Sequence, residues 1–226
     1  MFQGFTDKTL EFMWNIRFNN EKSWFEAHKD EYKAVLEGPM RELAQEVFSC
    51  VADRHRELDL RLHLSRIYRD ARRLHGRGPY KDHLWFSLRQ ESEEWTDKPV
   101  FWFELTPESW SYGLGYYSAK ALTMEKLRAR IDGNPRPLAE LAASLALQTE
   151  FILEGDEYAR TKREPGAILA EWYNKKNFSL IHEEAVSGAV FSSDLSERIK
   201  QGFEFLLPFY RYFIALEGDP RPRGDK

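Results

Sequence analysis

Apolar residues recur with helical spacing through the first fifty positions. One face of the first run carries apolar residues at i, i+3, i+4 and i+8, namely Leu10, Met13, Trp14 and Phe18. Thr6 or Asp7 suits the start of this helix, and the Asn pair at 19–20 suits its end. A second helical run spans 24–36 and is expected to break at Gly38-Pro39, and Pro39 suits the first turn of a third helix.

The spacing changes near residue 58. Leucines then alternate, at Leu58, Leu60, Leu62 and Leu64, which is the period of a strand. Residues 83–90 and 99–118 read as further strands, and the "TPES" stretch at 106–109 has the chemistry of a hairpin turn. The pattern thus predicts a sheet rich in aromatic residues after the N-terminal helices.

Helical spacing returns in the second half of the chain, at 123–131, 137–147 and 167–173. A hairpin is expected around Gly155-Asp156, and a strand at 178–185. A long last helix begins near Asp194, and its expected buried side is Leu195, Ile199, Phe203, Leu206, Tyr210 and Phe213.

Helices, then strands, then mixed elements predict an α+β fold. We expect a helical N-terminal third packed on a largely antiparallel sheet, followed by further helices including a long C-terminal one. With no Pro/Gly/Ser-rich linker, residues 1–217 are expected to form a single domain, and 218–226 a polar tail.

The net charge and the cysteine content bear on the class of partner and on the cellular compartment of the protein. The 226 residues carry a formal net charge of −4, which argues against a nonspecific DNA binder. The lone cysteine, Cys50, fits a reducing compartment, and no secretory signal or membrane-spanning run is seen. We therefore expect a cytoplasmic protein without a membrane partner.

One short segment departs from this acidic balance. Residues 65–83 hold the cations Arg66, Arg69, Arg72, Arg73, Arg77 and Lys81 against Asp70 and Asp82. If 65–70 is a strand, Arg66 follows the leucine face inward and needs a partner, which Asp70, Glu104 or an anionic ligand would supply. Gly76 and Gly78 allow the backbone to approach a ligand closely.

This segment predicts a cleft that binds a phosphorylated or other anionic small molecule. The expected ligand-binding residues are Arg66, Arg69, Asp70, Arg72, Tyr80 and Lys81. In this hypothesis Asp70 orients one of the cations and does not touch the ligand. Asp70 and Asp82 are also candidates for a general acid and a general base near a bound phosphate.

Two other interpretations of the basic segment stay open. It is an interaction module for protein or nucleic acid, with nucleic acid the less favoured, or its cations are purely structural and pair with carboxylates. His63, His75 and His83 lack a compact metal-ligand spacing, so no metal and no cofactor are expected. The sequence fixes neither a reaction nor an oligomeric state.

Several motifs resemble one known family. The opening "GFTDKTLEFMWNIRFNNEKSWFEAHKDEY", the central "RIYRDARRLHGRGPYKDH" and the aromatic "FWFELTPESWSYGLGYY" are similar to the domain-of-unknown-function 2461 family, over nearly the whole chain. The resemblance implies one α+β domain and no activity. Ala71 and Arg73 stand where the family usually has Thr and Phe, and 74–77 replaces a Ser-Lys-Asp-Lys-like loop.

Overall fold

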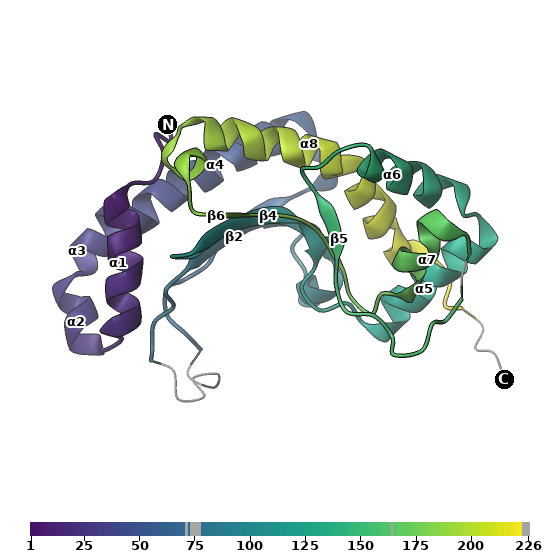
Figure 1. Ribbon diagram of the computed structural model, residues 1–226, viewed down its shortest axis with the longest axis horizontal. Coiled ribbons are helices and arrows are strands. Elements are labelled where there is room, and N and C mark those ends of the chain that lie inside the picture. The colour runs from purple at the N-terminus through teal and green to yellow at the C-terminus, as the bar shows by residue number, and fades with distance from the viewer. Residues whose placement is uncertain (71, 73–77, 164, 223–226) are drawn as a thin grey trace. The chain divides into compact units, whose positions relative to one another are not determined.

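The computed structural model describes residues 1–70, 72, 78–163 and 165–222 (Figure 1). These fall into two compact units. The first contains Met1–Leu88, Trp102–Tyr112 and Glu183–Gln201, and the second contains Arg89–Phe101, Gly113–His182 and Gly202–Lys226. Strands β3, β4 and β6 and helix α8, whose bounds follow, contribute residues to both units. The single domain expected over 1–217 stays a prediction.

The N-terminal helices (purple in Figure 1) are α1 (Asp7–Phe18), α2 (Lys22–Ala27), α3 (Lys29–Tyr32) and α4 (Gly38–Arg54). The predicted ends of α1 are confirmed, with Thr6 at its N-cap and Asn19 at its C-cap. Its predicted buried side is wrong in part. Trp14 and Phe18 are exposed, whereas Thr9, Phe12, Met13 and Ile16 are buried. Apolar residues cover so wide an arc of α1 that spacing alone does not select the inner face.

The break expected at Gly38-Pro39 is not seen. The chain runs from α3 through a π-helical turn, η1 (Lys33–Glu37), directly into α4. Pro39 lies in the first turn of α4, as predicted, where its missing N–H costs nothing. A Cβ on Gly38 would lie 2.8 Å from the carbonyl oxygen of Lys33, so glycine is what lets the two helical turns join.

The expected strand at 58–64 is shorter than its leucine pattern. Residues Arg56–Leu58 form a 3-10 turn, η2, and Asp59 has a φ of 46°, in the left-handed region. Strand β1 therefore spans only Arg61–Leu64. After it Ser65 and Ile67 are buried, so Arg66 is exposed and not drawn inward as the alternation suggested.

The fold is α+β with an antiparallel sheet, as predicted. Among the described residues the strands follow the order β1-β2-β3-β4-β6-β5. Their bounds are β2 Leu84–Arg89, β3 Pro99–Leu105, β4 Ser109–Tyr116, β5 Ile152–Glu154 and β6 Ser179–Ala185. Residues 106–108 form the predicted turn between β3 and β4, where the backbone N–H of Thr106 donates to the carbonyl of Ser109 at 2.8 Å.

The second unit holds α5 (Ala121–Gly133), α6 (Arg136–Ala146) and α7 (Ala167–Asn174), near one another in Figure 1. The hairpin expected around Gly155-Asp156 is wrong. Strand β5 instead pairs with β6, with Leu153 opposite Leu180, and Glu157 bridges to Lys175. Gly155 has a φ of 137° and lies against the backbone of Asn177, so it serves a close crossing of chains and not a two-residue turn.

The described residues also form η4 (Trp95–Asp97), η5 (Gly188–Phe191), α8 (Asp194–Ile214) and η6 (Ala215–Gly218). All six residues predicted for the inner side of α8 are buried. In the first unit Phe103 packs on Phe5 and Phe86. In the second, Phe101 packs on Phe203 and Tyr210.

Candidate functional site

The two arms of the basic segment run side by side. Tyr68 and Tyr80 form an antiparallel bridge, Arg69 donates its backbone N–H to Pro79, and Lys81 donates its own to Ile67. Ile67 and Tyr80 are buried. The arms are thus short extended stretches, and side chains on either side of Tyr80 project in defined directions.

The side chain of Asn20, just after α1, holds this bridge in place. Its amide group donates to the carbonyl of Tyr80 and accepts from the N–H of Tyr80, both at 2.9 Å. A Cβ on Gly78 would lie 2.2 Å from the Asn20 side-chain oxygen, so glycine is needed where the asparagine crosses. The ring of Tyr80 stacks on Phe25 with 4.3 Å between centroids, which fixes the bridge on the core.

Asp82, directly after this bridge, is the centre of an ion-pair network. It accepts a hydrogen bond from Arg17 Nε of α1 at 2.5 Å, and His83 Nδ1 lies 3.0 Å from its other oxygen. Arg69 Nη2 lies 3.7 Å away. The hydrogen bonds from His83 and Arg17 hold the pKa of Asp82 well below its usual range, so this carboxylate stays ionised.

Arg17 and Arg69 are committed to their neighbours. Arg17 also binds Glu108 in a two-pronged pair, with one contact at 2.9 Å, and this pairing raises the pKa of the guanidinium further. Arg69 Nε donates to the carbonyl of Tyr80 at 2.8 Å. Both arginines therefore cross-link segments of the first unit that are far apart in the sequence or on different arms.

Glu104 of β3 lies on the other side of His83. Its Oε1 is 3.7 Å from His83 Nε2. Burial raises the pKa of Glu104 above its ordinary value, and Glu183 and Asp82 add to this, while His83 and Lys81 oppose it. His83 thus stands between one carboxylate whose pKa is low and one whose pKa is high, an arrangement typical of sites that hold or move protons.

Lys81 is a half-buried cation of this group. Its ammonium makes no hydrogen bond or ion pair with any residue that the structure describes, and its nearest described aromatic contact is Trp85, 6.0 Å from the ring centroid. Burial lowers the pKa of Lys81. The positive charges of Arg69 and Arg66 lower this pKa further, whereas the negative charge of Glu104 opposes the shift. A half-buried ammonium beside two guanidinium groups is a favourable place for an anion.

The predicted site residues separate into three groups. Arg66 is exposed and close enough to Lys81 to act on its charge, and its expected pairing with Asp70 or Glu104 is not found among the described residues. Asp70 instead holds the exposed Arg72 through two side-chain hydrogen bonds, at 3.0 and 2.7 Å. Arg69 and Tyr80 build the frame, with the ring of Tyr80 only 2% exposed. Residues 71 and 73–77 lie outside the described part of the chain.

Sequence reasoning missed Arg17 and the central place of His83. Arg17 interrupts an apolar helix, but nothing in the sequence connects it with Asp82, which lies 65 positions later. In the sequence, His83 stands out only as one of three histidines that lack a compact metal-ligand spacing. In the described residues no group of three or more His, Cys, Asp or Glu side chains is arranged to hold a metal. The available signal was the Asp82-His83 pair placed just before a strand.

The fold and this network define an α+β protein with a polar cluster formed by Arg17, Arg69, Lys81, Asp82, His83 and Glu104. The family model described as a conserved hypothetical protein (DUF2461) matches residues 8–212. The chain belongs to this family, as the resemblance of its motifs indicated. No curated protein matches the chain.

Proposed function

We propose that the polar cluster binds a small anionic ligand, a phosphate ester or a carboxylate, at Lys81. The observation that carries the proposal is the half-buried Lys81 ammonium, which has no partner among the described residues. A cation withdrawn from water without a counterion raises the energy of the folded protein, and a bound oxyanion removes that cost. Arg66 adds a second, exposed cation next to it.

Glu104 is suited to tolerate such a ligand. Its raised pKa means that it takes up a proton more readily than an ordinary glutamate when a second negative charge arrives. The neutral carboxyl then becomes a hydrogen-bond donor. The ionised Asp82 is meanwhile neutralised by Arg17 and His83, so it does not repel the ligand strongly.

Nucleic-acid binding is less favoured by the same surroundings. Glu104, Glu108 and Glu183 lie within this network, and Glu183 accepts a hydrogen bond from Ser109 at the start of β4. A long polyanion would meet these carboxylates, whereas a small ligand would contact only Lys81 and Arg66.

The cytoplasmic location expected from the lone cysteine remains a proposal. No helix of the described residues is long and apolar enough to cross a membrane.

A thermal-shift panel tests the proposal. It contains inorganic phosphate, pyrophosphate, citrate, nucleotides and a short single-stranded oligonucleotide, each at constant ionic strength. A ligand at about one hundred times its Kd stabilises the folded state by about 2.7 kcal/mol, which raises the midpoint of wild-type protein. The Lys81→Met variant should lose the shift, and the matched Arg72→Met variant should keep it. If the midpoint rises only with the oligonucleotide, or with nothing, the proposal is wrong.

A second function, proton transfer at His83, is favoured by the opposite pKa shifts of Asp82 and Glu104 on its two sides. Lys81 and His83 both act on the charge of Glu104, so an ester group held at Lys81 would lie in the same polar cluster as this histidine. We expect turnover of at least one phosphate or carboxylate ester that binds wild type. The His83→Gln variant should bind that ester but not turn it over. Equal turnover by wild type and the variant would contradict proton transfer at His83, and so would binding without turnover of any ester in the panel. Either result would leave only the proposed binding function.

A further inference from the structure

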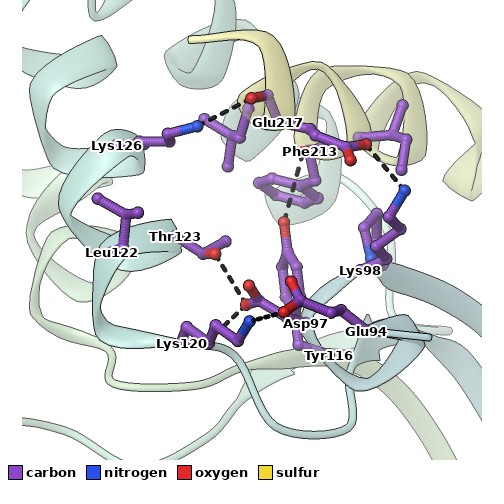
Figure 2. Close-up of a pocket in the computed structure, with 13 residues that line it drawn as sticks. Glu94, Asp97, Lys98, Tyr116, Lys120, Leu122, Thr123, Lys126, Phe213 and Glu217 are labelled. Atoms are coloured by element: carbon purple, nitrogen blue, oxygen red, sulfur yellow. Dashed lines mark hydrogen bonds and ion pairs between the residues drawn. The ribbon is translucent and has the colours of Figure 1, made fainter. Parts of the chain in front are cut away.

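A separate cavity lies within the second unit (Figure 2). Its volume is about 200 Å³. Buried apolar side chains line it from β4, α8 and η6, namely Tyr116, Phe213 and Leu216, which are at most 5% exposed. Because an apolar cavity of about 150 Å³ holds a benzene molecule, this one has room for a small ring and one polar group.

Charged side chains ring this apolar lining. Lys98 Nζ lies 2.9 Å from Glu217 Oε2, and Lys126 Nζ donates to the backbone carbonyl of Glu217 at 2.8 Å. Lys120 pairs with Glu94 on another side of the cavity, as Figure 2 shows. Two ammonium groups therefore contact Glu217, Lys98 at its carboxylate and Lys126 at its backbone carbonyl.

Asp97, another acid that lines the cavity, is held in place by hydrogen bonds at the start of α5. Asp97 Oδ1 accepts hydrogen bonds from the backbone N–H of Lys120 at 2.6 Å and from the hydroxyl of Thr123 at 2.7 Å, and so holds the first turn of α5. Among the described residues it makes no ion pair with Lys98 or Lys126. The Lys98–Glu217 pair thus forms a polar edge of the cavity beside its apolar wall.

A ligand carboxylate can displace the Glu217 side chain from Lys98 at little cost in stability. The side chain of Lys98 is only 19% exposed, whereas that of Glu217 is 64% exposed. An exposed carboxylate gains little net stability from such a pair, because water and lost side-chain freedom offset the attraction. A ligand carboxylate of the same charge can replace it at little cost, provided that the rest of the ligand covers the apolar wall.

We infer that this cavity binds a small apolar monocarboxylate, whose carboxylate takes the place of the Glu217 side chain on Lys98. Its apolar body packs against Phe213, Leu216 and Tyr116. The Glu217 carboxylate competes with the ligand for this position. The inference is independent of the proposed site at Lys81, because every residue that lines the cavity belongs to the second unit.

Benzoate is the probe, and its uncharged analogue benzamide is the control ligand. Titration calorimetry on the full chain should show saturable binding of benzoate and much weaker binding of benzamide. Lys98→Met should weaken benzoate binding by about tenfold or more, because a charge-assisted hydrogen bond is lost. The matched Arg136→Met variant, which removes an exposed ion pair with Glu140 on α6 and does not line the cavity, should bind within about twofold of wild type.

Glu217→Gln separates this inference from a merely structural role of the lysines. It removes the competing carboxylate and should tighten benzoate binding by up to about fivefold. Unchanged thermal midpoints would show that each variant folds. Absence of benzoate binding to wild type, equal binding by the Lys98→Met variant, or weaker binding by Glu217→Gln would each overturn the inference.

Discussion

At the scale of single residues, the basic segment contains two kinds of cation. Arg69 and Arg17 are held by Asp82, and Arg69 also by a backbone carbonyl, so both contribute to the stability of the first unit. Lys81 has no partner among the described residues, and its burial opposes its charge. The contrast separates the cations that hold the fold from Lys81, the half-buried cation that a ligand can reach beside the exposed Arg66.

This contrast predicts opposite effects of two substitutions. Arg69→Ala should lower the free energy of unfolding by about 1.5–3 kcal/mol, because it removes a charge-assisted hydrogen bond and a partner of Asp82. Lys81→Met keeps the apolar stem and removes a half-buried charge, so stability should stay within about 0.5 kcal/mol of wild type or rise. Urea unfolding measures both. A marked loss in Lys81→Met would mean that this lysine is structural.

The lowered pKa of Asp82 predicts a pH dependence with a definite sign. Its folded-state pKa lies below the unfolded value, so the carboxylate stabilises the fold above the ordinary aspartate pKa of about 3.9, and this stability is lost as the pH falls. The gap in unfolding free energy between wild type and Asp82→Asn should therefore be full at pH 7 and shrink below about pH 4. A gap that widens on acidification contradicts this account of the network.

At the scale of elements, spacing predicted the helices and strands well and their faces less well. The bounds of α1 and the buried side of α8 followed from the sequence, because caps and a regular apolar stripe are local signals. The inner side of α1, the direction of Arg66 and the pairing of β5 with β6 did not. Each depends on which distant segment covers the element, which a single sequence does not state.

The site shows the same limit. The segment that carries Lys81 was recognisable from its local charge excess, but Arg17 and Glu104 reach it only through the fold. The sequence also does not indicate which of the predicted cations forms an ion pair with a carboxylate. Arg72 and Asp70 are close in sequence and pair, whereas Arg69 meets Asp82 across the Tyr68–Tyr80 bridge.

One glycine of strand β4 gives a test at this scale. A Cβ on Gly113 would lie 2.0 Å from the carbonyl oxygen of Leu180, where backbone has little room to shift. Gly113→Ala should lower the free energy of unfolding by about 1–3 kcal/mol. Gly133→Ala, in open space at the end of α5, is the matched control and should be neutral or stabilising by up to about 1 kcal/mol. Equal effects in denaturant unfolding would show that β4 and β6 do not approach so closely.

At the scale of the whole molecule, the two units are linked by shared elements. Strands β3, β4 and β6 and helix α8 each have residues in both units. Unfolding one unit would therefore remove part of every shared element from the other. This continuity favours one cooperative domain over 1–217, although the two units have separate aromatic contacts.

Cooperativity is measurable with the chain's own chromophores. Trp110 and Trp24 report on the first unit, and Trp172 on the second. Single-tryptophan variants should unfold in urea with midpoints that coincide with one another and with the loss of helical circular dichroism. Separate midpoints for the Trp110 and Trp172 reporters would show two independently folding domains.

The central claim is that Lys81 holds an anion that the protein itself does not supply. Titration calorimetry at constant ionic strength, with the anion that gives the largest thermal shift, tests it most directly. Wild type and Arg72→Met should bind with affinities within about twofold of each other, and Lys81→Met should bind at least about tenfold more weakly, the effect of losing one charge-assisted hydrogen bond. Equal affinity of wild type and Lys81→Met would contradict the claim.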